Sequence, residues 1–178
     1  LQTVRIIIIL SVIISHYLRW DSHVTYVTSA AVKRRLLFLK RHLQQAPPPT
    51  KLIACNAFVR SLLEYADVAW FPHTKYLIGK LEAIQTKAVR FMFSKCRPTD
   101  SPTQLLKKAG ILTLENRAKL ARLKLLYQLL HNQLNLDKTR YLMAPETRPT
   151  CHRHLETLKE HTFRTDCLKY SFFSTYNK

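Results

Sequence analysis

The sequence predicts a mainly α-helical fold, in which a helical bundle follows a short N-terminal β-strand and precedes a weakly structured C-terminal tail. Apolar residues recur at spacings of three and four over most of the chain, which is typical of amphipathic helices. Prolines and Gly110 lie where these segments would begin or end. Hydrophobic residues make up 47% of the 178 residues, which is enough for a folded core. We expect a strand segment (1–22), a basic helical domain (23–133) and a C-terminal extension (134–178).

The first predicted element is a buried β-strand within Val4–Ile14. This segment is apolar apart from Arg5 and Ser11, and its run of four isoleucines is β-branched throughout. It is shorter than the roughly 20 residues that a bilayer crossing needs. Its length also fits the apolar part of a signal peptide, but no small-residue cleavage site follows. The chain begins with Leu1, so we expect it to be a piece of a longer protein.

Two helices are expected next. The first runs from about His23 to Gln45 and ends at three consecutive prolines, which lack a backbone donor. The second begins at Thr50, a suitable N-cap residue, and is closed by Pro72. The first apolar stripe consists of Val32, Leu36, Leu39 and Leu43, and the second of Leu52, Cys55, Val59, Leu62 and Ala66.

A third helix is expected from about Thr74 to Ser94, and its apolar face consists of Leu77, Leu81, Ile84, Ala88 and Phe91. The sequence Ser101-Pro102-Thr103-Gln104 predicts a capping box at the start of a short helix, and Gly110 suits the left-handed position after it. Thr113 is expected to cap the longest helix, which continues to about Asn132. Its apolar face is wide and suggests burial against two neighbours; it includes Leu120, Leu123, Leu126, Tyr127 and Leu130.

The charge of the chain indicates a polyanionic partner. Lys and Arg number 29 against 11 Asp and Glu, which gives a formal net charge of +18. An excess of this size exceeds what solubility requires and favours RNA, DNA or an anionic membrane as partner. No acidic residue occurs from Ser22 to Leu63, and the bases lie on predicted helices rather than on a tail. The sequence therefore predicts a folded basic face.

The candidate nucleic-acid-binding residues lie on three of the predicted helices, where lysine and arginine side chains can reach phosphates. They are Lys33, Arg34, Arg35, Lys40 and Arg41 on the first helix, Lys87 and Arg90 on the third, and Arg117, Lys119, Arg122 and Lys124 on the longest. For any single one of them, a solvated cationic face remains an equal alternative.

Catalytic chemistry is not expected in this chain. Tyr65-Ala66-Asp67-Val68 is similar to the Tyr-x-Asp-Asp hairpin with which RNA-copying polymerases hold two Mg²⁺ ions, but Val68 replaces the second carboxylate. We interpret Asp67 as a helix-end or surface carboxylate. Two glycines are too few for a phosphate-binding loop, and no nucleophile motif such as G-x-S-x-G occurs.

The cysteines and histidines leave one metal site open. Four cysteines without close pairs do not form a disulfide framework and indicate a reducing compartment. A zinc site could draw its ligands from Cys151, His152, His154, His161 and Cys167. The alternative is an exposed basic loop in which the histidines are incidental.

Five segments, taken together and in order, resemble the region after the catalytic palm in reverse transcriptases of non-LTR (LINE-type) retrotransposons. Leu18–Val24 is similar to the pattern L-x-W-x-x-H-[IV], and Val59–Pro72 to V-R-x-x-L-E-Y-A-x-x-x-W-x-P. Leu81–Phe91 is similar to L-E-x-[IV]-Q-x-K-A-x-R-F, Gly110–Arg117 to the start of a later helix, and Tyr170–Phe173 to the first part of S-F-F-P-R-T.

The resemblance implies a thumb-like helical domain and C-terminal extension of an RNA-directed DNA polymerase. It implies RNA, an RNA–DNA duplex or target DNA as partner, together with the upstream polymerase domain of the parent protein, in the nucleus. Mg²⁺ and its carboxylate ligands would belong to that upstream palm, so no cofactor is expected in this chain. A membrane partner is not expected either.

Two features depart from the family pattern. The family's glycine is absent from Arg5–Leu10, and Ser174 stands where the family has proline. A decayed element copy is therefore an alternative, as is a structural docking module for the polymerase. Membrane association through Val4–Ile14 is a third alternative.

Overall fold

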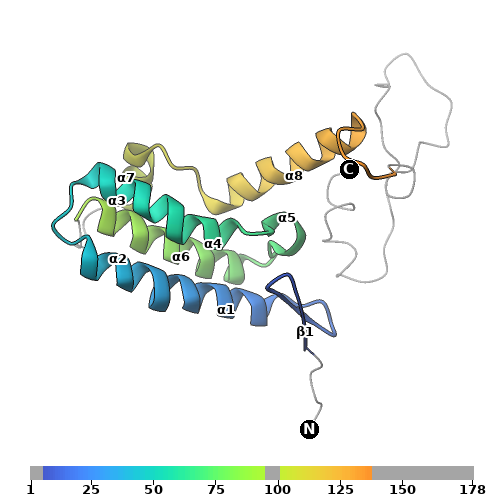
Figure 1. Ribbon diagram of the computed structural model, residues 1–178, viewed down its shortest axis with the longest axis horizontal. Coiled ribbons are helices and arrows are strands. Elements are labelled where there is room, and N and C mark those ends of the chain that lie inside the picture. Colours follow the sequence, from blue (N-terminus) through green and yellow to red (C-terminus); the bar gives the residue numbers. More distant parts are fainter. Residues whose placement is uncertain (1–5, 95–100, 138–178) are drawn as a thin grey trace, which may run out of the picture. The chain divides into compact units, whose positions relative to one another are not determined.

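A computed structural model describes residues 6–94 and 101–137, and it confirms the mainly α-helical fold (Figure 1). The chain divides into two compact units, Leu1–Ala118 and Lys119–Lys178. The first contains a β-hairpin and helices up to the start of α8 (Leu114–Leu130). The described part of the second consists of the remainder of α8 and the residues that follow it to position 137.

The N-terminal segment forms a hairpin rather than the single buried strand that was expected. Strand β1 (Ile6–Ile9) pairs antiparallel with β2 (Val12–Ser15), and all four residues of β1 are exposed. The turn at Leu10 and Ser11 has φ values of 46° and 64°, a left-handed geometry that matches the twist of paired strands. Strand β2 contacts α1 and carries the buried residues of the hairpin.

The first long helix consists of α1 (Asp21–Ala30), the π-helical segment η1 (Ala31–Leu36) and α2 (Leu37–His42). Its buried residues are spaced for an α-helix up to Ala31, the first residue of the π segment, and again from Leu36, its last residue: Val24, Val27 and Ala31, then Leu36 and Leu39. The step from Ala31 to Leu36 is one π-helical repeat, because a π-helix bonds residue i to residue i+5. The expected stripe through Leu36 and Leu39 is thus confirmed only for the second half of the helix.

The second long helix consists of α3 (Pro48–Cys55), η2 (Asn56–Arg60) and α4 (Ser61–Glu64). It begins at Pro48, so the expectation that Thr50 caps it is wrong. Proline suits the first turn, where the missing N–H group would have no partner. The buried residues follow a spacing of four and are Lys51, Cys55, Val59 and Leu63.

This helix also ends earlier than expected. It stops at Glu64, Ala66 adopts a left-handed conformation with φ of 54°, and a single turn, α5 (Asp67–Trp70), precedes Pro72. Asp67 lies in the first turn of α5, as a helix-end carboxylate would, but it is only 7% exposed and is therefore not a surface residue.

Helix α6 (Lys75–Met92) buries all five residues of its predicted face, so that prediction is confirmed. The short helix α7 (Pro102–Ala109) has proline at its first position and Gly110 in the left-handed conformation, as expected. The expected capping box is not formed, because Ser101 makes no side-chain cap bond. At the start of α8, the Asn116 N–H donates to Thr113 Oγ1 at 3.3 Å, which confirms the cap.

The wide apolar face predicted for the longest helix is not buried as a whole. Leu129 is buried in the second unit, but Leu120, Leu123 and Tyr127 are about half exposed. The expectation that this face lies against two neighbours was wrong for these three residues.

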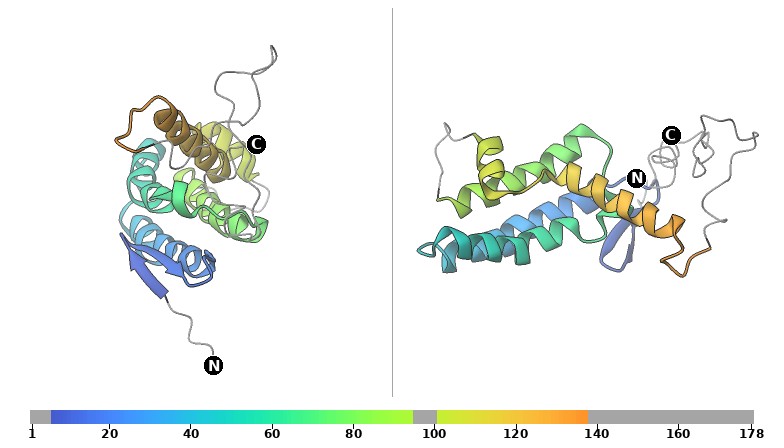
Figure 2. Two further views of the ribbon diagram at one scale, coloured as in Figure 1. Left: turned by 90° about the vertical axis from the view of Figure 1, so that its right-hand side faces the viewer. Right: turned by 90° about the horizontal axis from the view of Figure 1, so that it is seen from above.

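The two long helices of the first unit run side by side in opposite directions, and α6 contacts both of them (Figures 1 and 2). Helix α7 packs on α6. The core lies between these helices, and its most completely buried large side chains include Trp70, Leu36, Leu39, Leu81 and Val89. This packing fixes which face of each helix is left for solvent.

His23 joins the hairpin to this core. Its side chain is 2% exposed, its Nδ1 accepts the Ile13 N–H at 3.2 Å, and its ring lies edge-on to Trp70 at 4.6 Å. Burial lowers the pKa of His23 from its ordinary value of 6.5, because the charged imidazolium loses hydration. A proton on Nδ1 would also point at the Ile13 donor.

We expect the first unit to lose stability as the pH falls below 6.5, the ordinary pKa of a histidine side chain. Between that value and the lower folded pKa, the unfolded chain binds more protons at His23, so the free energy of unfolding rises with pH in this window. The measurement is urea unfolding between pH 7.5 and 5.5 for wild type and His23→Asn, which keeps an acceptor near Nδ1. The wild type should lose more stability than the variant, and equal losses would contradict this role of His23.

Candidate nucleic-acid interface

Five predicted site residues lie together on the solvent side of the first long helix. Lys33, Arg34 and Arg35 lie on η1, and Lys40 and Arg41 on α2, and all five are exposed. The burial of Leu36 and Leu39 in the core fixes the rotation of this helix and leaves the five side chains exposed beside and opposite the buried stripe. We refer to these five side chains as the basic helix surface.

The charges of the basic helix surface are not neutralised within the described residues. None of the five takes part in an ion pair there. The nearest acids along the chain are Asp21 and Glu64, outside the acid-free stretch. Like charges held this close on a rigid element create a positive potential that a polyanion would relieve. The segment η1 is a further reason to regard this surface as a candidate site, because π-helical turns occur frequently at functional sites.

One aromatic side chain that lies among the residues of the basic helix surface was missed by the sequence reasoning. Phe38 is 51% exposed, and its ring lies 4.4 Å from that of His42 at an angle of 46°. Arg34 precedes it by one helical turn and Arg41 follows it by one turn. The available signal was the position of Phe38 between charged residues and off the stripe of Leu36 and Leu39.

The two candidates on α6 differ in exposure. Lys87 is exposed, whereas Arg90 is half-buried, and its Nε is buried without a hydrogen-bond partner among the described residues. Of the three candidates in the second unit, Lys119 and Lys124 are exposed and Arg122 is half-buried. They form a separate set, on the part of α8 that follows Ala118.

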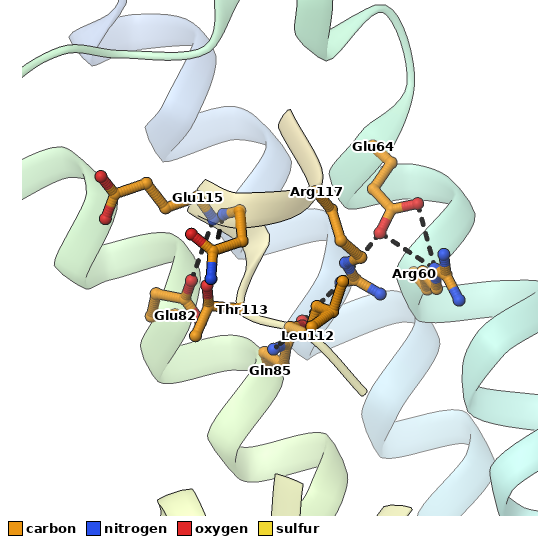
Figure 3. A network of polar contacts seen from close by, with 9 residues as sticks. Arg60, Glu64, Glu82, Gln85, Leu112, Thr113, Glu115 and Arg117 are labelled. Carbon is orange, nitrogen blue, oxygen red and sulfur yellow. Dashed lines mark hydrogen bonds and ion pairs between the residues drawn. The ribbon is translucent and has the colours of Figure 1, made fainter. Parts of the chain in front are cut away.

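Arg117 is not part of an exposed surface. Its side chain is 10% exposed, its Nη2 lies 2.8 Å from Glu64 Oε1, and it donates a hydrogen bond to Gln85 Oε1 (Figure 3). Both oxygens of Glu64 also accept from Arg60 Nε, each at 3.0 Å. Burial lowers the pKa of Arg117, while the charge of Glu64 raises it. The expectation that Arg117 contacts phosphate does not fit this geometry, because the guanidinium would have to abandon Glu64.

The same network ties the segment before α8 to α6. Gln85 Nε2 donates to the Leu112 carbonyl at 3.0 Å, and the Glu115 N–H donates to Glu82 Oε1 at 3.2 Å (Figure 3). Burial raises the pKa of Glu82, and the backbone donors at Glu115 and Leu114 oppose that rise. The network therefore joins α4, α6 and the first turn of α8 by polar contacts.

Residues that carry the family resemblance meet inside this unit. His23 contacts Trp70, whose Nε1 donates to the Tyr65 carbonyl at 2.7 Å. Glu64 holds Arg117, and Gln85 holds the Leu112 carbonyl. These side chains come from four of the five segments of the resemblance, and here they stabilise the fold.

The pocket beside the network is small and mainly apolar. Its cavity volume is about 20 Å³, and its lining includes Cys55, Met92 and Arg117. Small-molecule sites usually enclose roughly 300–1,000 Å³. Burial raises the pKa of the Cys55 thiol to about 11, so this cysteine is protonated near neutral pH and is a poor nucleophile. We assign no chemistry to this pocket.

No metal cluster is found in the described residues, where no group of three or more His, Cys, Asp or Glu side chains comes together. The predicted zinc ligands Cys151, His152, His154, His161 and Cys167 lie outside the described residues. Within residues 6–94 and 101–137, no helix has the length and apolar character needed to cross a membrane.

No protein-family model, curated protein or solved structure matches this chain. Any function must therefore be inferred from its residues and their arrangement.

Proposed function

We propose that this chain is a non-catalytic, nucleic-acid-binding part of an RNA-directed DNA polymerase of the non-LTR retrotransposon class. In this proposal it holds the sugar-phosphate backbone of template RNA or an RNA–DNA duplex through the basic helix surface. The observation that carries the proposal is the presence of five exposed, unneutralised bases between positions 33 and 41 on one core-anchored helix.

The physical basis of binding is electrostatic. Each phosphate neutralised by Lys or Arg releases condensed counterions, which favours binding on any sequence. A helix fixed by Leu36 and Leu39 presents its charges without a large ordering cost. Such contacts position a strand but read no bases. We therefore expect affinity to depend strongly on salt and weakly on sequence.

The resemblance supplies the polymerase context of the proposal. The five similar segments occur in the family's order, and they imply an upstream polymerase domain that would carry the catalytic carboxylates and Mg²⁺. RNA, an RNA–DNA duplex or target DNA would be the partner, and the nucleus the place of action. The contacts of His23, Trp70, Glu64 and Gln85 give these motif positions a structural role in the proposed domain.

A docking module for the polymerase is the second candidate. It is favoured by apolar side chains that remain exposed in the described residues, namely Ile6, Ile7, Ile8, Ile9 and Leu10 of the hairpin. In that case the exposed isoleucines would contact another domain, and the positive charge would be background.

Changing Lys33, Arg34 and Arg35 together to Gln should weaken binding to an RNA–DNA duplex by about tenfold or more at low salt. The slope of log affinity against log salt should become shallower by about two to three, because each lost phosphate contact removes roughly 0.9. Fluorescence anisotropy of a labelled heteroduplex over a range of salt concentrations would measure both quantities.

The matched control changes Lys75, Lys107 and Lys108 to Gln, which removes the same charge from exposed positions on α6 and α7. This control should keep most of the affinity. Equal losses in the two variants would indicate that only the net charge matters. Absent binding, or binding that the first variant leaves unchanged, would favour the docking module.

A further inference from the structure

Phe38 has a position that phosphate binding alone does not explain. Its ring is 51% exposed, although Leu36 and Leu39 of the same turn are buried. Arg34 and Arg41 lie one turn away on either side of it. An aromatic side chain buries 150–250 Å² when covered, so its exposure leaves a large apolar face available.

The surroundings of Phe38 fit one chemical class of ligand. The ring of His42 lies 4.4 Å from that of Phe38 and covers part of one side of the phenyl group. An apolar partner alone would have to approach through Arg34 and Arg41 and strip water from both. A partner that offers a flat π face between two negative groups satisfies the ring and both guanidinium groups together. A nucleotide within a strand has this combination of features.

We infer that Phe38 stacks on an unpaired base, so that the basic helix surface binds single-stranded RNA or DNA in preference to a continuous duplex. The inference rests on the proposed function and narrows it. In a duplex the faces of internal bases are covered by their neighbours, and Phe38 could reach none of them. In a single strand a base can turn outward onto the ring while its flanking phosphates meet Arg34 and Arg41.

The deciding measurement compares the full chain with Phe38→Leu on three labelled probes of about 20 nucleotides: oligo(dT), an abasic strand and a duplex. The abasic strand has the phosphates of oligo(dT) but no bases. Loss of the ring should weaken binding to oligo(dT) by about tenfold, the usual scale for one stacked base. Binding to the abasic strand and the duplex should change by less than about twofold, since no stacking occurs there.

Two further variants separate stacking from packing. Phe38→Trp should retain the affinity for oligo(dT), because indole stacks at least as well as phenyl. Leu37→Ala removes a neighbouring apolar side chain that is 42% exposed, and it should leave all three affinities unchanged. Far-UV circular dichroism of each variant would verify that the helix is retained.

The outcomes distinguish this inference from the function on which it rests. If the Lys33, Arg34 and Arg35 variant loses affinity for every probe while Phe38→Leu binds oligo(dT) like wild type, the function stands and stacking is overturned. Equal losses of Phe38→Leu on all three probes would also overturn stacking. If the triple variant binds every probe like wild type, the proposed function fails, and the stacking inference fails with it.

Discussion

Replacing Trp70 with alanine is expected to lower the free energy of unfolding by about 3–5 kcal/mol, the usual cost of deleting a large buried aromatic side chain. Trp70 has no exposed surface, and its ring contacts that of His23 at 4.6 Å. Its Nε1–H donates to the Tyr65 carbonyl at 2.7 Å and so holds the turn that separates α4 from α5. Alanine would leave a cavity and an unsatisfied carbonyl at the same place.

Trp70→Phe separates these two contributions. Phenylalanine keeps most of the apolar surface but has no donor for the Tyr65 carbonyl, so we expect a loss of about 1–3 kcal/mol. Trp20→Phe is the matched control, because Trp20 is only partly buried and should cost less. Urea unfolding followed by circular dichroism would measure all three variants. A loss below about 1 kcal/mol for Trp70→Ala would contradict a central role for this side chain in the core.

Helix α6 was predictable because one local rule determines both its pattern and its burial. Leu77, Leu81, Ile84, Ala88 and Phe91 recur at α-helical spacing, and all are buried in a continuous helix. No Pro lies within it, and its one glycine, Gly79, lies on an exposed turn where packing does not require a side chain. The apolar period alone therefore identifies the face that meets the core.

The two π-helical segments were not predictable from the same rule. In the first long helix, Val32 continues the apolar stripe backward from Leu36, whereas Ala31 continues the stripe formed by Val24 and Val27. Both stripes are consistent with helical spacing, and only tertiary packing selects the change of register in η1. The hairpin turn was also not predictable, because Leu10 and Ser11 adopt positive φ without the Gly or Asn that usually marks such a turn.

The candidate site could be predicted only in part from the sequence. The exposure of Lys33, Arg34 and Arg35 followed from the apolar positions beside them, because a base next to a buried leucine must point elsewhere. The burial of Arg117 did not follow, because Glu64 lies far away along the chain and meets it only after folding. Phe38 was overlooked because an aromatic residue within a helix is usually assigned to the core.

Glu64→Ala should cost about 3 kcal/mol of unfolding free energy, because the buried guanidinium of Arg117 would lose its ion-pair partner. The charges of Glu82 and Asp67 also favour the charged guanidinium, but each contributes less than that of Glu64. The Arg117 side chain is 10% exposed, and its Nε and Nη1 already have no hydrogen-bond partner among the described residues. Its remaining polar contact would be Gln85 Oε1. The measurement is urea unfolding of the full chain near pH 7.

The control is Arg60→Gln, which removes the other partner of Glu64. The Arg60 side chain is 43% exposed and pairs with Glu64 at i,i+4, so its loss should cost less than about 1 kcal/mol. The double variant Glu64→Leu with Arg117→Met should be more stable than Glu64→Ala, because no charge would remain buried. If Glu64→Ala and Arg60→Gln cost the same, Arg117 is solvated in solution rather than held by Glu64. Arg117 would then be available to phosphate, and it would rejoin the nucleic-acid-binding residues that the sequence predicts.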